Sequence, residues 1–574
     1  MFCKINNMEN FNSYYLKYNQ MWNKSFNIRL FLTVFLLVFI PLYTFNYIYP
    51  GIAPFKFFAN DSFYYFNLIK NSQQVNFFSY DGLNPTNGFH PIWEFTLFYL
   101  DKFNLIDINN KSDFLTNIYN INLFILSSAS GFFAIFCSKY LKFKWLAVAV
   151  FGPGIMGLVL SITAPDYLAT WSYVNGMETA IALLFFSLAL FFYTYKNKSF
   201  VFLFLSVFFM GLLVLSRLDD IFFFIPFFLL LIFKSKGRQK LYIFLFFVPS
   251  AVLIITYLIY NRITVGIYMP ISGWEKSGFA LLSNISMGIK LFLPVFSWDV
   301  PNVLNTSSVN YSMYSEYSMR ILQVLLPLFI AFIYLFGSYK KGKFNNFGIL
   351  EALSFGIIIK ALYNLLFVSL GRQGSWYFGT TIFITNFLLI LWLSFLLDEL
   401  LVKREKLFFL VKNWGVFIYI LISIVLFNGF INHKLNGGFG DIAFNVFSRR
   451  ENISDFIRKS GDNKFVEFED GIIAFSTNIP AIGGLGPILD PEASLARKNG
   501  IFFDLLIKRG YTLIITSNEY SFSMDNYLKN KLWLKSEDLW GIKSAEFENY
   551  KIEKIHHDES GYVTYYKIVK LKQS

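Results

Sequence analysis

The run RLFLTVFLLVFIPLYTFNYIY at residues 29–49 is followed by the polar stretch NDSFYYFNLIKNSQQVNFFSYDGLNPTNGFHPIW at residues 60–93. The first run is long enough to cross a membrane as a helix, for which about 20 apolar residues suffice. No small-residue cleavage site follows it, so we interpret it as a retained signal anchor. The second stretch contains tyrosines, turn-forming dipeptides and His90, the first of the chain's four histidines. We therefore expect it to form a polar loop at a membrane surface.

The composition of the whole chain indicates an integral membrane protein with many spans. Of its 574 residues, 55% are hydrophobic, 21% are aromatic and only 15% are charged, and the mean hydropathy is positive. A soluble domain of this size does not have such a composition. The formal charge of +13 does not require a nucleic-acid partner, because basic residues gather in the cytoplasmic loops of multi-pass proteins. Cys3 and Cys137 indicate neither a disulfide framework nor a metal site.

Windows of apolar residues predict a polytopic α-helical membrane protein with about 11 transmembrane helices. The predicted spans cover residues 29–49, 118–138, 143–163, 178–195, 199–216, 219–233, 241–260, 320–338, 348–369, 376–397 and 414–432. The connections on one side are all basic, namely residues 139–144, 196–198, 234–240, 340–343 and 403–412, whereas the loop at 164–177 has no Lys or Arg. This asymmetry places the N-terminus in the cytoplasm and the C-terminus outside.

We accordingly divide the chain into a cytoplasmic segment at residues 1–28, a transmembrane domain at 29–432 and an extracytoplasmic domain at 433–574. The transmembrane domain has two long outer loops, at residues 50–117 and 261–319.

Short helices are expected near residues 61–71 and 91–103 of the first outer loop, where they would lie on the membrane without crossing it. After residue 433 the charge density rises, and short β-branched or aromatic runs indicate a small α/β domain. The expected strands are KFVEFED (464–470), GIIAFST (471–477), YTLIITS (511–517) and YVTYYKIVKL (562–571), and the expected helices are Glu451–Ser460 and Pro491–Lys508.

Asp61 is the candidate catalytic residue of the first outer loop. Asn60 is a suitable N-cap for a helix that begins at residue 61, and the helix dipole favours a carboxylate in the first turn, so helix-start chemistry alone would explain Asp61. Its expected place at the outer membrane surface, one turn from Tyr64 and Tyr65, also suits a general base that acts on a hydroxyl acceptor. We expect Tyr64 to contact the substrate there.

The stretch YDGLNPTNGFHPIW at residues 80–93 contains the turn-forming dipeptides DG, NP and NG. We interpret its glycines and prolines as the scaffold of a tight loop. Asn84, Thr86, Asn87 and His90 add amide, hydroxyl and imidazole groups, which bind sugars and phosphates through oriented hydrogen bonds. These four side chains are therefore candidates for substrate binding.

Further polar candidates lie at the predicted outer ends of spans. Glu178 stands in the sequence NGMET, and Arg372 stands in GRQGSWY, where its planar guanidinium suits phosphate. The sequence SRLDD places Arg217, Asp219 and Asp220 between two apolar runs with almost no loop. Charges there are costly against lipid, so they pair with one another or face a polar cavity. Together these clusters predict a single extracytoplasmic site.

The motifs NDSFYY, YDGLNPTNGFHPIW, NGMETA and LSRLD resemble those of the bacterial membrane glycosyltransferases of the GT-C superfamily. The chain is similar to the mycobacterial terminal arabinofuranosyltransferases and to uncharacterised relatives with a TNG(F/Y)xP(L/I)W loop. The resemblance covers residues 29–235 well, the later spans in general layout, and the last domain loosely.

This resemblance implies an inverting transfer of a sugar from a polyprenyl-phosphate donor to a glycan, lipid or protein acceptor. The reaction would take place on the outer face of the bacterial cytoplasmic membrane, with Asp61 as the acidic residue on which catalysis depends. Arg217 or Arg372 would hold the leaving phosphate. Many relatives have two consecutive acidic residues where this chain has Asn60 and Asp61. A divalent metal is therefore not indicated by the residues, and the cofactor is left open.

Two other kinds of protein fit the same pattern. A transporter or flippase would use charges between spans to line a path, and it would hold Arg217, Asp219 and Asp220 at the bilayer centre. A membrane scaffold that displays the C-terminal domain would lack a lipid-sized groove beside Asp61.

Overall fold

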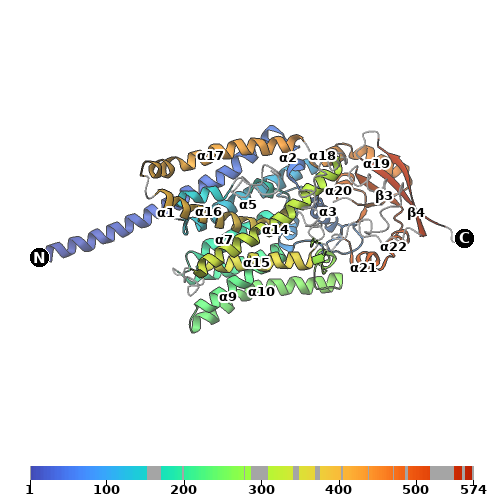
Figure 1. The fold of residues 1–574 in the computed structure, drawn as a ribbon. Helices are drawn as coiled ribbons and strands as arrows, with labels where there is room; N and C mark the ends of the chain where they lie inside the picture. Colours follow the sequence, from blue (N-terminus) through green and yellow to red (C-terminus); the bar gives the residue numbers. More distant parts are fainter. Residues whose placement is uncertain are drawn as a thin grey trace.

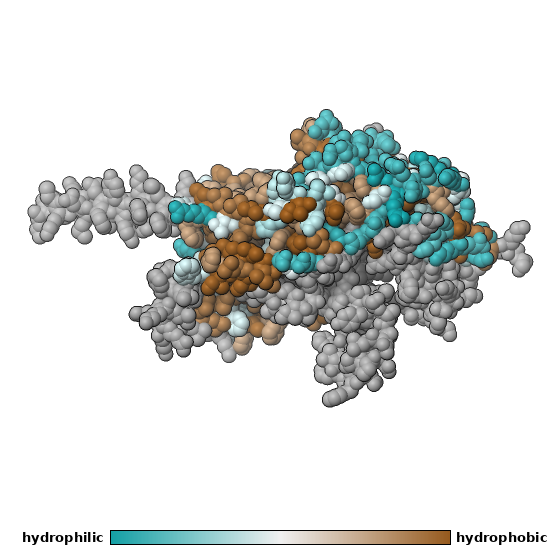
Figure 2. Space-filling view, turned by 90° about the horizontal axis from the view of Figure 1, so that it is seen from above, coloured by the Kyte–Doolittle hydropathy of each residue, from teal (hydrophilic) through white to brown (hydrophobic). Residues whose placement is uncertain are grey.

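The computed structural model describes residues 2–571, except residues 76, 142, 152–169, 197–198, 277, 283, 286–307, 341–347, 369–374, 402–404, 437–438, 469–470, 485–488, 518–548 and 559–562. A bundle of long helices lies beside a smaller region that carries the sheet (Figure 1). On the face seen in Figure 2, the bundle is mostly hydrophobic and the other end is rich in hydrophilic residues. The prediction of a polytopic helical protein with a C-terminal α/β region is confirmed.

Within the described residues, six stretches are long and apolar enough to cross a membrane, namely Ser25–Ile48, Lys111–Ser138, Arg238–Val265, Ile349–Phe367, Trp376–Leu397 and Trp414–Asn432. They belong largely to helices α1 (Phe2–Ile48), α5 (Lys111–Ser138), α10 (Arg238–Val265), α15 (Ile349–Phe367), α16 (Gly379–Leu401) and α17 (Glu405–Asn436). Other apolar helices are α7 (Thr179–Tyr193), α8 (Phe200–Ser216), α9 (Ile221–Lys234) and α14 (Ser308–Lys340).

Ten of the eleven predicted spans coincide with one of these helices. The exception is 143–163, where Lys144–Val150 form the 3-10 helix η1 and residues 152–169 lie outside the described part of the chain. Helices α7, α8 and α9 have only 15, 17 and 14 residues. They are short because polar residues interrupt the apolar runs, with Glu178 before α7 and the segment 217–220 between α8 and α9.

Small residues set the spacing of the helices that carry these polar interruptions. A Cβ atom on Gly211 of α8 would lie 2.2 Å from the side chain of Ser250 in α10, and one on Gly356 of α15 would lie 2.5 Å from Phe223 in α9. Close backbone approach through small residues is a common way to pack helices in a membrane. It brings α8 close to α10 and α15 close to α9.

The first outer loop contains α2 (Ala53–Phe57), α3 (Ser62–Ser72) and α4 (Pro91–Lys102). The predictions of helices near 61–71 and 91–103 are thus confirmed to within one residue. The expected N-cap is wrong by one residue, because Asp61, and not Asn60, occupies that position. The Ala59 amide donates to the carbonyl of Asn175 at 2.9 Å, which pins the turn before α3 and delays the start of the helix.

The C-terminal region contains a five-stranded sheet of order β2-β1-β3-β5-β4. Strand β1 is parallel to β2 and β3, whereas β5 is antiparallel to β3 and β4. The strands are β1 (Phe465–Glu467), β2 (Ala481–Gly483), β3 (Leu513–Ser517), β4 (Tyr550–His557) and β5 (Val563–Lys570). The helices are α18 (Phe439–Ser448), α19 (Arg450–Lys459), α20 (Ile472–Thr477), α21 (Pro491–Asn499) and α22 (Phe502–Lys508).

The prediction of a strand at 471–477 is wrong, because this run forms helix α20. Glu467 at the end of β1 accepts hydrogen bonds from the amides of Ile473 and Ala474 at 2.7 and 3.0 Å. A carboxylate that caps the first amides of a helix stabilises it. All six residues of α20 are buried and the first four are apolar, and an apolar run of this length does not distinguish a buried helix from a strand. The predicted helix at 491–508 is divided into α21 and α22 at Gly500, whose φ is +74°.

Helix α20 joins the C-terminal region to the first outer loop. Asn67 and Lys70 of α3 donate to the carbonyls of Gly471 and Ala474 at 2.8 and 3.3 Å, and Lys111 donates to the carbonyl of Ser476 at 2.8 Å. A Cβ atom on Gly471 would lie 3.0 Å from Asn67. The outer loop and the α/β region therefore form one packed unit.

Candidate functional site

The loop before α7 is held by three separate elements, and this fixes Glu178. The carbonyls of Asn175, Gly176 and Met177 accept hydrogen bonds from the Ala59 amide at 2.9 Å, Trp93 Nε1 at 2.9 Å and Asn122 Nδ2 at 3.2 Å. Gly176 has a φ of +72°, and a Cβ there would lie 3.0 Å from Phe58 and from Ser62. Only glycine fits such a position without strain.

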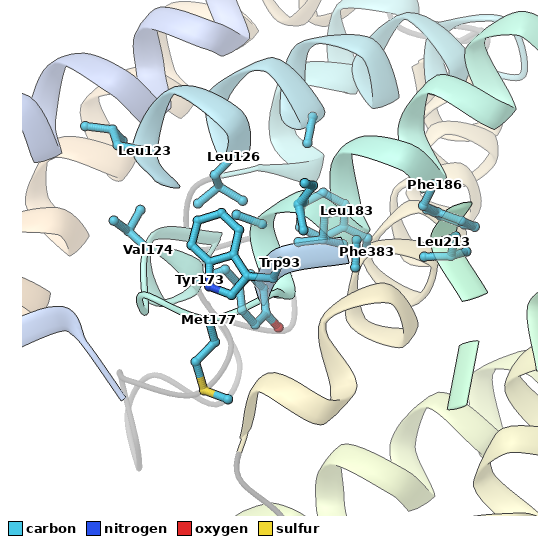
Figure 3. Close-up of a cluster of buried hydrophobic side chains, with 14 of the residues drawn as sticks. Trp93, Leu123, Leu126, Tyr173, Val174, Met177, Leu183, Phe186, Leu213 and Phe383 are labelled. Carbon is cyan, nitrogen blue, oxygen red and sulfur yellow. The ribbon is translucent and has the colours of Figure 1, made fainter. Parts of the chain in front are cut away.

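Apolar side chains surround this loop and exclude water from it. Figure 3 shows the indole of Trp93 at the centre of a cluster drawn from the loop and from four other helices. Its labelled members are Trp93, Leu123, Leu126, Tyr173, Val174, Met177, Leu183, Phe186, Leu213 and Phe383. The cluster holds α4, α5, α7, α8 and α16 together. Glu178 is consequently placed in surroundings of low polarity.

Glu178 is fully buried and joins three predicted site elements. Its Oε1 accepts a hydrogen bond from Arg217 Nη1 at 2.6 Å and lies 3.5 Å from His90 Nε2. Its Oε2 accepts a hydrogen bond from Tyr65 Oη at 2.9 Å. Burial raises the pKa of the Tyr65 hydroxyl, and the charge of Glu178 adds to the rise. Tyr65 therefore remains a hydrogen-bond donor. The structure brings together His90 of the loop at 80–93, Glu178 before α7 and Arg217 at the α8–α9 junction.

The α8–α9 junction continues this network through Lys360. Asp219 lies 3.3 Å from Arg217 Nε and 2.7 Å from Lys360 Nζ. Asp220 lies 2.6 Å from the same Nζ and accepts a hydrogen bond from Thr380 Oγ1 at 2.8 Å. Arg217, Asp220 and Lys360 are each at most 1% exposed, so these three residues are shielded from water, whereas the side chain of Asp219 is 20% exposed.

Arg217 keeps unused hydrogen-bonding capacity within this network. Its Nε and Nη2 are buried and have no hydrogen-bond partner among the residues that the structure describes. The guanidinium lies 4.6 Å from the ring centre of Tyr377. Burying donors that remain unpaired costs free energy, so this arrangement favours an acceptor that enters beside Arg217.

Tyr173 supplies another such donor nearby. Its hydroxyl is buried and likewise has no hydrogen-bond partner in the described part of the chain. Burial raises the pKa of this hydroxyl, and the positive charge of Arg217 acts against the rise. The hydroxyl thus stays protonated near the guanidinium, where it adds to the donors available for an anion.

Asp61 and Tyr64 lie on the same outer helix as Tyr65. Asp61 is half-buried in helical conformation at the start of α3, four residues before Tyr65 and therefore on the same face. The Tyr64 ring lies 5.9 Å from that of Tyr80 in an edge-on contact. The structure thus places Asp61 one turn from the network, and Tyr64 toward the C-terminal region.

Three of the loop candidates bind groups of the protein itself. Asn84 contacts Asp81 through its amide and its side chain, at 2.8 and 2.7 Å. Thr86 donates to the carbonyl of Leu489 at 2.9 Å. Asn87 Nδ2 donates to the Met269 carbonyl at 3.2 Å, and its Oδ1 accepts from the Ile271 amide at 3.0 Å. Of the four loop candidates, His90 is the one that reaches the charged network.

The remaining predicted residue is Arg372, and three network residues were not predicted. Arg372 lies outside the described residues. Sequence reasoning did not single out Lys360, Thr380 or Tyr65 as site residues. Lys360 had a signal, since it is the only basic residue in the predicted span 348–369, and charges inside spans are usually functional.

The placement of the acidic and histidine side chains bears on metal binding. In the described ranges, no group of three or more His, Cys, Asp or Glu side chains is placed to hold a metal ion. The carboxylates of Glu178, Asp219 and Asp220 each have a cationic partner in the network.

No protein-family model matches the chain, and no curated protein matches its sequence. Among solved structures, the oligosaccharyltransferase AglB from Archaeoglobus fulgidus, in complex with an inhibitory peptide and a dolichol-phosphate, is 12% identical. That match covers 97% of this chain and 75% of AglB, with a TM-score of 0.45. ArnT from Cupriavidus metallidurans, bound to undecaprenyl phosphate, is also 12% identical, with coverage of 94% and 97% and a TM-score of 0.49. Matches this distant decide neither the fold family nor the activity.

Proposed function

We propose that this protein is a membrane glycosyltransferase of the GT-C type that transfers a sugar from a polyprenyl phosphate. The observation that carries the proposal is the buried Arg217, whose Nε and Nη2 lack hydrogen-bond partners among the described residues. An Arg guanidinium matches the oxygens of a phosphate. The helices around it are apolar, which suits a phosphate that carries a lipid chain. The motif resemblance of residues 29–235 points to the same donor.

The reaction requires a base, a leaving-group site and an acceptor. Asp61 removes the proton from an acceptor hydroxyl, and the resulting oxygen attacks the anomeric carbon from the side opposite the phosphate. The new glycosidic bond forms as the bond between that carbon and the phosphate oxygen breaks, which inverts the anomeric configuration. Arg217 stabilises the charge that develops on the departing phosphate, and the Tyr173 hydroxyl adds a second donor. Arg372 is a further candidate for this role.

The other candidates support this arrangement in different ways. Glu178 orients Arg217 and Tyr65 through hydrogen bonds of 2.6 and 2.9 Å, and His90 faces the same carboxylate. Tyr64, Asn84 and Thr86 lie where the outer loop meets the C-terminal region, and Asn84 and Thr86 line a small hollow there with Tyr80, Asp81, Ile482 and Asp490. We assign this side to the acceptor, which is a glycan, a lipid or a protein.

The proposed setting is the bacterial cytoplasmic membrane, with residues 1–28 in the cytoplasm and the α/β region outside. The basic connections of the sequence support this orientation. The motif resemblance leaves the sugar open, and polyprenyl-phosphate arabinose serves as the first donor to test because the arabinofuranosyltransferases are among the proteins that share the motifs.

Transport is the second candidate, and one observation favours it. Lys360 lies well inside α15 and is only 1% exposed, and a charge buried deep in a span also suits a translocation path. A transporter, however, moves a lipid-linked sugar without breaking its phosphate bond.

The experiment is a transfer assay on the full chain in lipid nanodiscs, with polyprenyl-phosphate arabinose as donor and membrane glycans as acceptor. Release of free polyprenyl phosphate that depends on acceptor supports the transferase. Asp61→Asn should lower the release about 100-fold or more, because a positioned general base contributes about that much. Unchanged release by Asp61→Asn would remove Asp61 as the base, and transbilayer movement of intact donor would favour transport.

A further inference from the structure

Lys360 holds both acidic residues of the α8–α9 junction. Its Nζ lies 2.7 Å from Asp219 and 2.6 Å from Asp220. Gly356, one turn earlier on α15, allows the close approach to α9 that makes these contacts possible, since a Cβ there would lie 3.0 Å from the Phe222 carbonyl. The lysine therefore reaches the junction from a helix that the chain forms some 140 residues later.

The two acidic residues differ in their relation to Arg217. Asp219 lies 3.3 Å from Arg217 Nε, without the geometry of a hydrogen bond. Asp220 points instead to Lys360 and to Thr380 Oγ1, at 2.6 and 2.8 Å. If Lys360 were absent, Asp219 would lose its 2.7 Å partner, and the nearest remaining cation would be Arg217. A charge-assisted hydrogen bond would then occupy the donors that now stay open.

The charge balance of the network adds to this effect. Three carboxylates, those of Glu178, Asp219 and Asp220, face two cations, those of Arg217 and Lys360. Without Lys360, Arg217 would remain as the single Arg or Lys cation against three carboxylates, two of which, Glu178 and Asp220, are fully buried. An incoming anion would be repelled by the excess negative charge.

We propose that Lys360 is a positioning residue that keeps Asp219, 3.3 Å from Arg217 Nε, out of hydrogen-bond geometry with the guanidinium, and so keeps Arg217 Nη2 open for an anionic ligand. The inference rests on the proposed function in one respect, namely that Arg217 binds the phosphate of the donor. Lys360 itself does not contact the phosphate. A lysine that only stabilised the helix bundle would affect folding but not the choice between a phosphate and a neutral ligand.

The test measures binding of farnesyl phosphate to the full chain in detergent, with farnesol as the neutral reference. Wild type should bind the phosphate more tightly than the alcohol. Lys360→Met should weaken binding of farnesyl phosphate by about tenfold or more, because the phosphate would lose its charge-assisted contact with Arg217. Binding of farnesol should stay unchanged. Lys360→Arg keeps the positive charge, and it should bind farnesyl phosphate more tightly than Lys360→Met does.

A matched pair of double variants separates position from charge. Lys360→Met/Asp219→Asn and Lys360→Met/Asp220→Asn restore the same net charge, but only the first removes the carboxylate beside Arg217. The first should recover most of the phosphate binding and the second should not. Equal recovery by both would overturn the positioning role in favour of net charge, and recovery by neither would overturn the proposal altogether.

Two further outcomes are decisive. Should Lys360→Met fail to fold, the comparison between the two double variants carries the same test, because each is balanced in charge. Farnesyl phosphate binding by Lys360→Met at the wild-type level would contradict the proposal. A wild type that binds farnesol as well as farnesyl phosphate would instead contradict the phosphate site of the proposed function.

Discussion

The loop at residues 80–90 and the charged network around Arg217 are both polar, yet their polar groups are used differently. In the loop, the side chains of Asn84, Thr86 and Asn87 bind nearby backbone and acidic groups. In the network, Arg217 is paired with Glu178 but keeps two buried nitrogens without a hydrogen-bond partner among the described residues. The loop side chains whose bonds are all made support the site, whereas the unused buried donors of Arg217, beside a charged network, leave room for a ligand.

Arg217→Met should produce the largest effect of the changes that test this comparison. Loss of a single donor to a developing oxyanion typically costs about 100-fold to 1,000-fold in rate, and we expect that loss in the transfer assay. The variant also leaves Glu178 buried without its cation, which is destabilising. The double variant Arg217→Met/Glu178→Gln serves as the control, because it removes the unpaired charge. Recovery of transfer by the double variant would show that Arg217 only neutralises Glu178.

Asn87→Ala should produce an intermediate effect, on stability and not on chemistry. The variant loses hydrogen bonds to the Met269 carbonyl and from the Ile271 amide, of 3.2 and 3.0 Å. Leaving buried backbone groups unpaired costs about 1–3 kcal/mol, which a thermal melt in detergent would detect. The rate per folded molecule should stay within about threefold of wild type. Asn84→Ala, at a half-buried position, is the matched control and should cost less. A large rise in donor KM without loss of stability would show that Asn87 contacts substrate.

Glu94→Gln should produce the smallest effect, and its sign depends on pH. Glu94 is fully buried in α4, and neither carboxylate oxygen has a partner among the residues described. Burial raises its pKa in the folded protein. Between the pKa of Glu94 in the unfolded chain and its raised pKa in the folded protein, the unfolded chain has released a proton that the folded protein keeps. Stability therefore falls as the pH rises through this range.

The Glu94→Gln variant cannot ionise at this position, so it removes the pH-dependent loss of stability. Glu94→Gln should match or exceed the thermal stability of wild type at pH 8, and the advantage should shrink toward about pH 3.5, where both states of the wild type hold the proton. Melting curves at the two pH values measure it. A variant that is less stable than wild type at pH 8 would show that Glu94 has an ionic partner.

The sequence allowed much of the helical framework to be predicted, because each long apolar run must form a helix in lipid. The loop candidates and the SRLDD segment were also visible, since charges and turn formers stand out against apolar runs. Lys360 was overlooked although it is the only basic residue in its predicted span. The run at 471–477 was misassigned because its pattern is the same for a buried helix and a strand.

The pairing within the site could not be predicted from the sequence. The contact between Lys360 and Asp220 joins residues 140 positions apart, and the bond between Tyr65 and Glu178 joins residues 113 apart. Such pairs depend on how α3, α7, α8 and α15 pack, which local patterns do not encode. For the same reason, the sequence did not show that Asn87 would bind the segment at 269–271 while His90 would turn toward Glu178.

The most direct test of the phosphate site is an experimental structure of the full chain in nanodiscs that contain undecaprenyl phosphate. We predict density for the phosphate within hydrogen-bond distance of Arg217 Nη2, about 2.7–3.2 Å, with Lys360 still paired to Asp219 and Asp220. Density for the lipid phosphate elsewhere, with Arg217 unchanged beside Glu178, would contradict the account.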